Sequence, residues 1–131
     1  MRDLLLVGMG GFVGSVARYA FGAWVTQLVP AGRFPLATLA VNTLGCLAIG
    51  VFSSIAEQSS AFSLHTRLVV ITGVLGGFTT FSAFAYESYF LAREQAWAFV
   101  ALNIAAHVLL GLAMVWLGHA AASQLIGRGT P

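Results

Sequence analysis

Four long stretches of this chain are almost free of charged side chains, and each is long enough to cross a lipid bilayer. They cover residues 4–29, 36–55, 68–91 and 97–118, and Arg18 and Glu87 are the only charged residues inside them. A membrane-spanning helix needs about 20 mainly apolar residues. The sequence therefore predicts an all-α integral membrane protein in which residues 1–131 form a single transmembrane domain of four helices.

The composition excludes several other classes of protein. Charged residues make up 8% of the chain and the mean hydropathy is +0.90, whereas ordinary soluble domains carry about 25% charged residues. The single cysteine, Cys46, excludes a disulfide framework or a thiolate metal cluster. The arginines are scattered rather than gathered in a basic run, so we expect membrane lipid and no nucleic acid as a partner.

The arginines give almost no information about which way the helices insert. With four spans, both termini and the second connection share one side; that side carries Arg2, Arg67 and Arg128, and the other carries Arg33, Arg93 and, if its side chain reaches outward, Arg18. An excess of arginine and lysine normally fixes the orientation. One interpretation is insertion in both orientations, which permits an antiparallel dual-topology homodimer, and the other is a modest bias settled by other factors.

Polar side chains recur inside the spans, although four helices leave little room for an aqueous pathway within one chain. In lipid such side chains are costly unless they face protein or water. A pathway at an interface between two copies resolves this conflict, so we expect a homodimer. Two pairs of small residues, Gly10 with Gly14 and Gly73 with Gly77, favour close helix contact.

The middle of the third stretch is a poor continuous helix. Glycine occurs at positions 73, 76 and 77, and Thr79 and Thr80 follow directly; each interior glycine costs about 1 kcal/mol. We predict that the third helix is broken at the membrane midplane, with the threonines capping its second half. Freed carbonyls at such a break can hold a cation. The alternative is an unbroken helix with a glycine-rich packing face.

Aromatic and amide side chains lie close to the predicted break. Phe81 and Phe84 share a helical face, and the positive edge of a phenylalanine ring can approach an anion. Thr38 and Asn42 share a face of the second span, where Asn42 offers two N–H donors. Each of these residues also has a structural interpretation: the rings as core or lipid-facing groups, the amide as an interhelical hydrogen bond, and the Ser82 hydroxyl as a bond to its own helix.

Two charged residues inside the spans allow more than one role. Arg18 is either an anion-attracting group in a vestibule or a side chain that snorkels to the membrane surface. Glu87 is either a proton carrier or a polar lining residue.

Three blocks of this sequence closely resemble the signature blocks of the Fluc (CrcB) family of fluoride channels. They are GGFVGSVARY at residues 10–19, TLAVNTLG at residues 38–45 and GVLGGFTTFSAF at residues 73–84. The resemblance covers nearly the whole chain, and the third block is its most specific part. It implies a passive fluoride channel of the bacterial inner (cytoplasmic) membrane that confers fluoride resistance, built as an antiparallel dual-topology homodimer with two fluoride pathways.

The resemblance also implies roles for individual residues. The fluoride path would contain Phe81 and Phe84 as its aromatic pair, Asn42 as its amide donor, and Thr38, Ser82 and Glu87 as polar lining. The backbone carbonyls of Gly76 and Thr79 would bind a structural sodium ion at the dimer centre, and Arg18 would lie near the vestibule.

The chain departs from the family pattern at three positions. Ala83 occupies a place often held by threonine. In the fourth span, similar proteins commonly have tyrosine and serine where this chain has Asn103 and His107. These two residues would rebuild the outer part of the fluoride path, and His107 either adds pH dependence near neutrality or is a hydrogen-bonded packing residue.

Two other function classes fit the sequence less well. A proton-coupled exporter similar to the small multidrug resistance family shares the size and the four spans, but it needs a deep acidic residue in the first span, which here has only Asp3 at its margin. An enzyme is not expected. The glycines near the N-terminus fail the dinucleotide-binding register, because Val13 occupies the third glycine position.

Overall fold

The computed structural model describes residues 1–29, 32–58 and 62–127. Within these ranges the chain is helical apart from short connections. Four helices are long and apolar enough to cross a membrane: Arg2–Leu28, Leu36–Gln58, Leu64–Arg93 and Trp97–Gly127. Arg128 lies outside the described residues, as do positions 30–31 and 59–61 of two connections. The protein is therefore an all-helical, multi-pass membrane protein.

The first, second and fourth spans are single helices, whereas the third is composite. These single helices are α1 (Arg2–Leu28), α2 (Leu36–Gln58) and α6 (Trp97–Gly127). The third span consists of α3 (Leu64–Arg67), the π-helix η1 (Leu68–Leu75), α4 (Gly76–Phe78) and α5 (Phe81–Arg93). The π-helical turns were not predicted by the sequence analysis; such turns often occur next to functional sites. Helix α6 continues to Gly127, well past the apolar stretch, because an alanine-rich segment follows Gly118.

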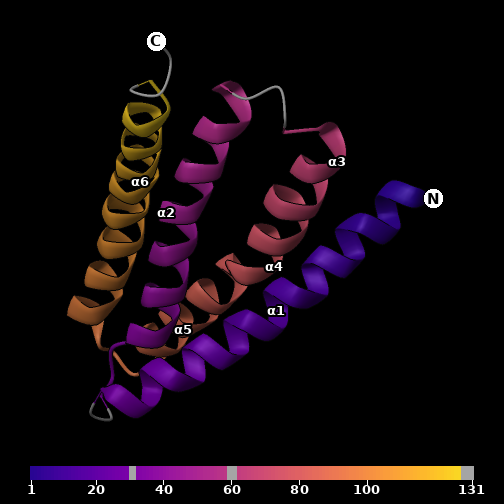
Figure 1. Cartoon of the computed structure of the whole chain (residues 1–131). Coiled ribbons are helices and arrows are strands. Elements are labelled where there is room, and N and C mark those ends of the chain that lie inside the picture. The colour runs from indigo at the N-terminus through magenta and orange to yellow at the C-terminus, as the bar shows by residue number, and fades with distance from the viewer. Residues whose placement is uncertain (30–31, 59–61, 128–131) are drawn as a thin grey trace.

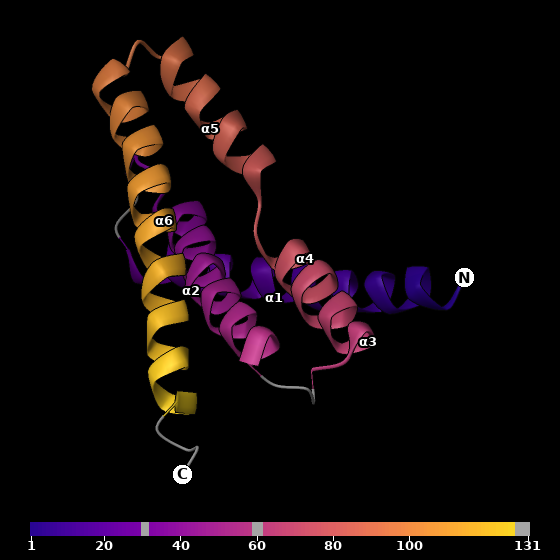
Figure 2. The same cartoon turned by 90° about the horizontal axis from the view of Figure 1, so that it is seen from above.

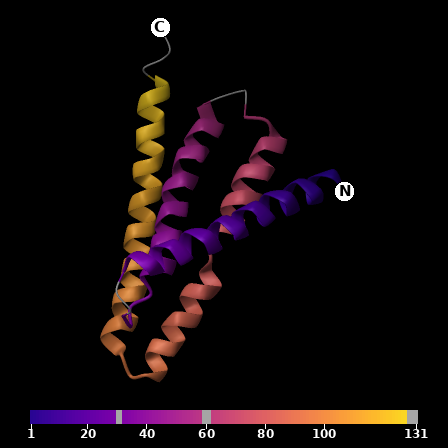
Figure 3. The ribbon, with the colours of Figure 1, turned by 60° about the horizontal axis from the view of Figure 1, so that its bottom comes forward.

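The helices form two packed units: α2 with α6, and α1 with the first half of the third span. The second half of the third span, α5, connects the two units by contacting α6. Helix α2 lies along α6, while α1 crosses η1 and α4 (Figure 1). Seen from above, α5 leaves the direction of α4 and runs to meet α6 (Figure 2). Helix α1 crosses the third span close to the point where α4 ends and α5 begins (Figure 3). The change of direction in the third span therefore lies where three spans meet.

Glycines permit the closest helix contacts in both pairs. A Cβ atom placed on Gly10 would lie 3.0 Å from the Cα of Gly73, and one on Gly77 would lie 2.6 Å from the carbonyl oxygen of Gly11. The expected contact through these small residues is confirmed. The α2–α6 pair uses the same device, which the sequence analysis missed: a Cβ on Gly50 would meet His119 N at 3.0 Å, and one on Gly118 would meet Val51 N at 3.0 Å.

Much of the apolar surface is exposed. Leu4, Phe12 and Tyr19 on α1 are 75%, 72% and 80% exposed, and Trp116 on α6 is 70% exposed. Exposed apolar side chains at this density suit acyl chains or a neighbouring protein better than water. One copy of the chain therefore leaves most of its apolar surface for lipid or another subunit.

We predict that Gly14→Ala destabilises the packing of α1 against the third span. The added Cβ would lie 2.8 Å from Phe78 N and would also clash with the Val74 carbonyl, and both neighbours are backbone that cannot turn away. Overpacking of this kind costs about 1–3 kcal/mol. A lower thermal unfolding temperature in detergent is the expected result. Gly8→Ala is the matched control, because nothing lies within 4 Å of its added Cβ; equal melting temperatures for the two variants would contradict the packing.

Candidate functional site

Two extended residues separate α4 from α5. Thr79 has φ −80° and ψ 158°, and Thr80 has φ −150° and ψ 111°. The Thr80 hydroxyl accepts a hydrogen bond from Ala83 N at 3.2 Å, so Thr80 caps the N-terminus of α5 as expected. Helical hydrogen bonding is thus interrupted inside an apolar span, where unpaired backbone groups are costly.

The side chain of Asn42 compensates for the interruption. Its Nδ2 donates to the Thr80 carbonyl at 3.0 Å, and its Oδ1 accepts from the Thr80 N–H at 2.8 Å. In a continuous helix that N–H would bond to the carbonyl of Gly76. Asn42 therefore supplies the acceptor that the Thr80 N–H lacks and gives the Thr80 carbonyl a donor from a neighbouring helix, and one amide hydrogen is left over for another acceptor.

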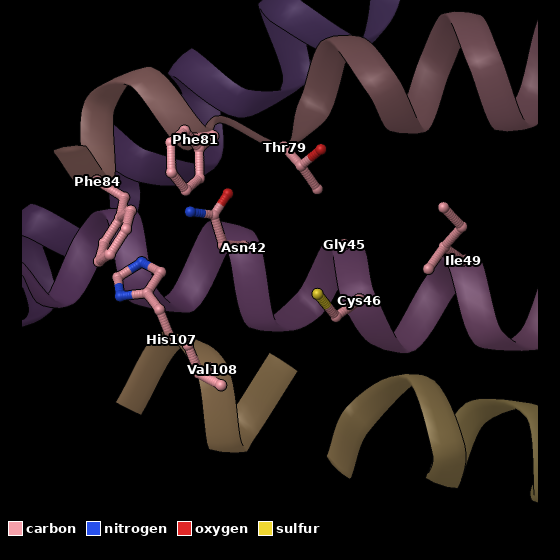
Figure 4. Close-up of a pocket in the computed structure, with 9 residues that line it drawn as sticks. All are labelled: Asn42, Gly45, Cys46, Ile49, Thr79, Phe81, Phe84, His107 and Val108. Carbon is pink, nitrogen blue, oxygen red and sulfur yellow. The ribbon is translucent and has the colours of Figure 1, made fainter. Parts of the chain in front are cut away.

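A cavity of about 300 Å³ is bordered by Thr79 and by the first turn of α5. Asn42, Phe81, Phe84 and His107 point toward this space from three helices (Figure 4). The rings of Phe81 and Phe84 are 5.4 Å apart and inclined by 57°, and the Phe84 and His107 rings are 4.4 Å apart. The cavity is lined mainly by apolar groups with a few polar ones; its walls are Asn42, Gly45, Cys46, Ile49, Thr79, Phe81, Phe84, His107 and Val108.

A second cavity, of about 290 Å³, is bordered by Thr80 and Ala83. Its polar walls include Arg18, Thr38 and Thr80. Arg18 Nη1 lies 3.4 Å from the Thr79 carbonyl oxygen, so this side chain turns toward the interruption rather than toward the membrane surface. The Thr38 hydroxyl donates to Glu87 Oε1 at 2.5 Å, and Glu87 Oε2 is buried without a hydrogen-bond partner among the described residues.

A polar chain connects α5 and α6 behind the first cavity. Asn103 is fully buried; its Nδ2 donates to Ser88 Oγ at 3.0 Å, and Ser88 in turn donates to the Phe84 carbonyl at 2.8 Å. His107 Nδ1 lies 3.0 Å from the carbonyl oxygen of Asn103. Asn103 Oδ1 and His107 Nε2 are buried without a partner in the described part of the chain. Together with Glu87 Oε2 near the second cavity, three buried side-chain atoms lack a hydrogen-bond partner among the described residues.

The structure divides the predicted site residues into groups. Asn42, Phe81, Phe84 and His107 share the first cavity, Arg18 and Thr38 share the second, and Glu87 binds Thr38. Ser82 is exposed, with its hydroxyl 3.2 Å from that of Thr80. Asn103 lines neither cavity but binds both α5 and His107.

The sequence analysis missed two residues of this region. Ser88 links Phe84 to Asn103, and Cys46 lines the first cavity. Ser88 is one helical turn after Phe84, and Cys46 one turn after Asn42. A polar residue one turn from a candidate site residue was the available signal in both cases.

A family model and individual relatives place this chain in the same protein family. A family model described as "CrcB-like protein, Camphor Resistance (CrcB)" matches residues 5–119. The chain is similar to the "Fluoride-specific ion channel FluC" of Nitratidesulfovibrio vulgaris, with 42% identity over 90% of this chain and 94% of that protein. The protein of the same name from Rhizobium etli is 44% identical over 96% of this chain and 100% of its own length. That from Methylobacillus flagellatus is 40% identical over 90% and 92%.

We predict that Asn42→Leu lowers stability, because it removes the acceptor of the Thr80 N–H and one donor to the Thr80 carbonyl. Each polar group left unpaired in a buried position costs about 1–3 kcal/mol. The thermal unfolding temperature in detergent should fall markedly, with a smaller fall for Asn42→Asp, which keeps the acceptor. The control is Thr26→Val, which removes an exposed bond within α1. A fall no larger than that of the control would show that Asn42 does not support the interruption.

Proposed function

Because the chain belongs to the CrcB family of fluoride channels, which are ion channels rather than enzymes, we propose that it conducts fluoride passively and selectively. We place it in the cytoplasmic membrane of a bacterium, where export of fluoride down its electrochemical gradient confers fluoride resistance. The identity of the ion depends on the names of the relatives. The observation that supports conduction through this chain is the interrupted third span, with Asn42 and the Phe81–Phe84 pair beside one cavity.

The first cavity offers the groups that a small, strongly hydrated anion needs. Asn42 keeps one amide hydrogen after its bond to Thr80. The edges of Phe81 and Phe84 carry partial positive charge and lack acceptor atoms. Fluoride would exchange its water for these groups, and the hydroxyls of Thr38 and Ser82 would continue the polar lining. A narrow, rigid path of this kind would exclude the larger chloride ion.

An antiparallel homodimer with two pathways completes the proposal. Phe81 lines the first cavity, yet 79% of this residue is exposed. A single chain therefore leaves the first cavity without a complete wall beside Phe81. The nearly balanced arginine count permits insertion in both orientations. A second, inverted copy would cover this exposed ring and repeat the same path.

A structural sodium ion at the dimer centre fits the backbone geometry. The Thr80 N–H is committed to Asn42, which releases the Gly76 carbonyl from its helical partner. The Thr79 carbonyl lies beyond the end of α4, with Arg18 Nη1 at a long 3.4 Å. Carbonyl oxygens suit a hard cation. One chain offers two of these ligands and an inverted copy would offer two more, which would tie the ion to dimer formation.

The exporter alternative gains no support from the first span. Its acidic residue, Asp3, is 62% exposed at the start of α1 and lies 3.7 Å from His65. A carboxylate in that position cannot serve a binding site deep in the membrane.

The first test of the proposal is ion efflux from liposomes that contain the purified protein. We expect fluoride release, and little chloride release, after a potassium ionophore is added, as followed with ion-selective electrodes. Asn42→Asp should abolish most of the flux, because a carboxylate would face the anion. Gln95→Glu, the same chemical change in an exposed connection, should conduct normally. No fluoride release would reject the function, and equal release of both ions would reject selectivity.

The second test is the orientation of the chain in the membrane. Gln95→Cys in a Cys46→Ser background places one thiol in the connection between α5 and α6 without changing the charge. If both orientations occur, a membrane-impermeant maleimide should label about half of the protein in sealed cells, and detergent should expose the remainder. Complete labelling, or none, before detergent would refute dual topology.

A further inference from the structure

His107 extends into the first cavity from α6. Its ring lies against Phe84, with 4.4 Å between the ring centres, and it shares the cavity wall with Asn42 and Phe81. The close-up shows one ring nitrogen turned toward the side of the cavity on which Asn42 lies (Figure 4). An imidazole therefore borders the space in which we propose that fluoride travels.

The hydrogen bond to Asn103 determines which nitrogen of the ring carries a proton. Nδ1 lies 3.0 Å from the Asn103 carbonyl oxygen, and a carbonyl oxygen can only accept, so Nδ1 is the N–H donor. In the neutral ring, Nε2 then presents a lone pair. This atom is buried and has no hydrogen-bond partner among the described residues. Nε2 is an acceptor when the ring is neutral and a donor when the ring is protonated.

A lone pair directed into an anion path repels the anion, whereas an imidazolium N–H attracts it. We infer that this cavity binds fluoride together with a proton on His107 Nε2, so that fluoride conduction is linked to pH. In this step a hydronium ion of the bulk solvent gives its proton to Nε2 and becomes water, and fluoride accepts a hydrogen bond from the new Nε2–H group. The pair enters the cavity with no net change of charge. This inference rests on the proposed function, because it describes how pH would regulate the proposed fluoride path.

The residues around His107 show which side chain of the first cavity can carry a positive charge. Helix α2 contributes Asn42 and the thiol of Cys46 to the cavity wall. Helix α5 contributes the Phe81 and Phe84 rings, while its carboxylate, Glu87, is bonded to Thr38. Arg18 belongs to the second cavity. Among the described residues that line the first cavity, His107 is therefore the one that can become a cation.

The pH dependence of fluoride efflux tests the inference. Fluoride release by the wild-type protein should rise several-fold as the pH is lowered from about 8 to about 5, because protonation of His107 replaces the lone pair on Nε2 with an N–H donor. Liposomes without protein correct for any leak of hydrofluoric acid. His107→Gln, whose amide does not titrate, should give a flat profile. His119→Gln is the control, because this histidine on the same helix is half exposed and pairs with Glu57 outside the cavity; it should keep the wild-type profile.

Proton uptake gives a second measurement that does not depend on transport. Sodium fluoride added to the detergent-solubilised protein in weak buffer should cause uptake of on the order of one proton per chain, and sodium chloride should not. His107→Gln should lose this uptake and His119→Gln should keep it. Fluoride efflux with a flat pH profile and no proton uptake would overturn the inference while leaving the channel intact. No fluoride efflux at any pH would overturn the proposed function itself.

Discussion

The reciprocal pair of hydrogen bonds between Asn42 and Thr80 is the interaction on which this architecture depends. Inside hydrocarbon, a backbone N–H or C=O without a partner costs several kcal/mol, so an interrupted helix needs partners from elsewhere. Asn42 supplies a donor and an acceptor from the neighbouring helix, at 3.0 and 2.8 Å. This bridge allows α5 to take a new direction within a predominantly apolar span.

Everything proposed for ion conduction follows from that change of direction. Two cavities adjoin the interruption, one with aromatic walls and one that contains Arg18 and Thr38. The bridge also directs the Gly76 and Thr79 carbonyls away from regular helical bonding. The interhelical hydrogen bond that the sequence analysis considered for Asn42 is present, and it does not exclude the proposed role as an anion donor, because one amide group can bind the backbone and still keep a hydrogen.

Different parts of the molecule were predictable to different degrees. The apolar stretches located the four spans, and the glycine pairs in the first and third spans indicated close helix contact; that these two spans contact each other came from the structure. The partners of polar side chains were not predictable: Thr38 with Glu87, or Asn103 with Ser88, are matched by helix rotation and depth rather than by spacing along the chain. The π-helix η1 also left no signal, since its residues are ordinary apolar ones.

By itself, the sequence determined that the chain is suited to a lipid bilayer and that it has four spans, because burying charge in a bilayer is costly and these spans contain almost no charge. It also determined where the third span is weak, because glycine and threonine are poor helix formers at the positions they occupy. Only the tertiary structure decided that Arg18 faces Thr79, that His107 lies against Phe84 and that Nε2 remains without a partner. Those relations depend on how separate helices cross, and the order of residues along one helix does not contain that information.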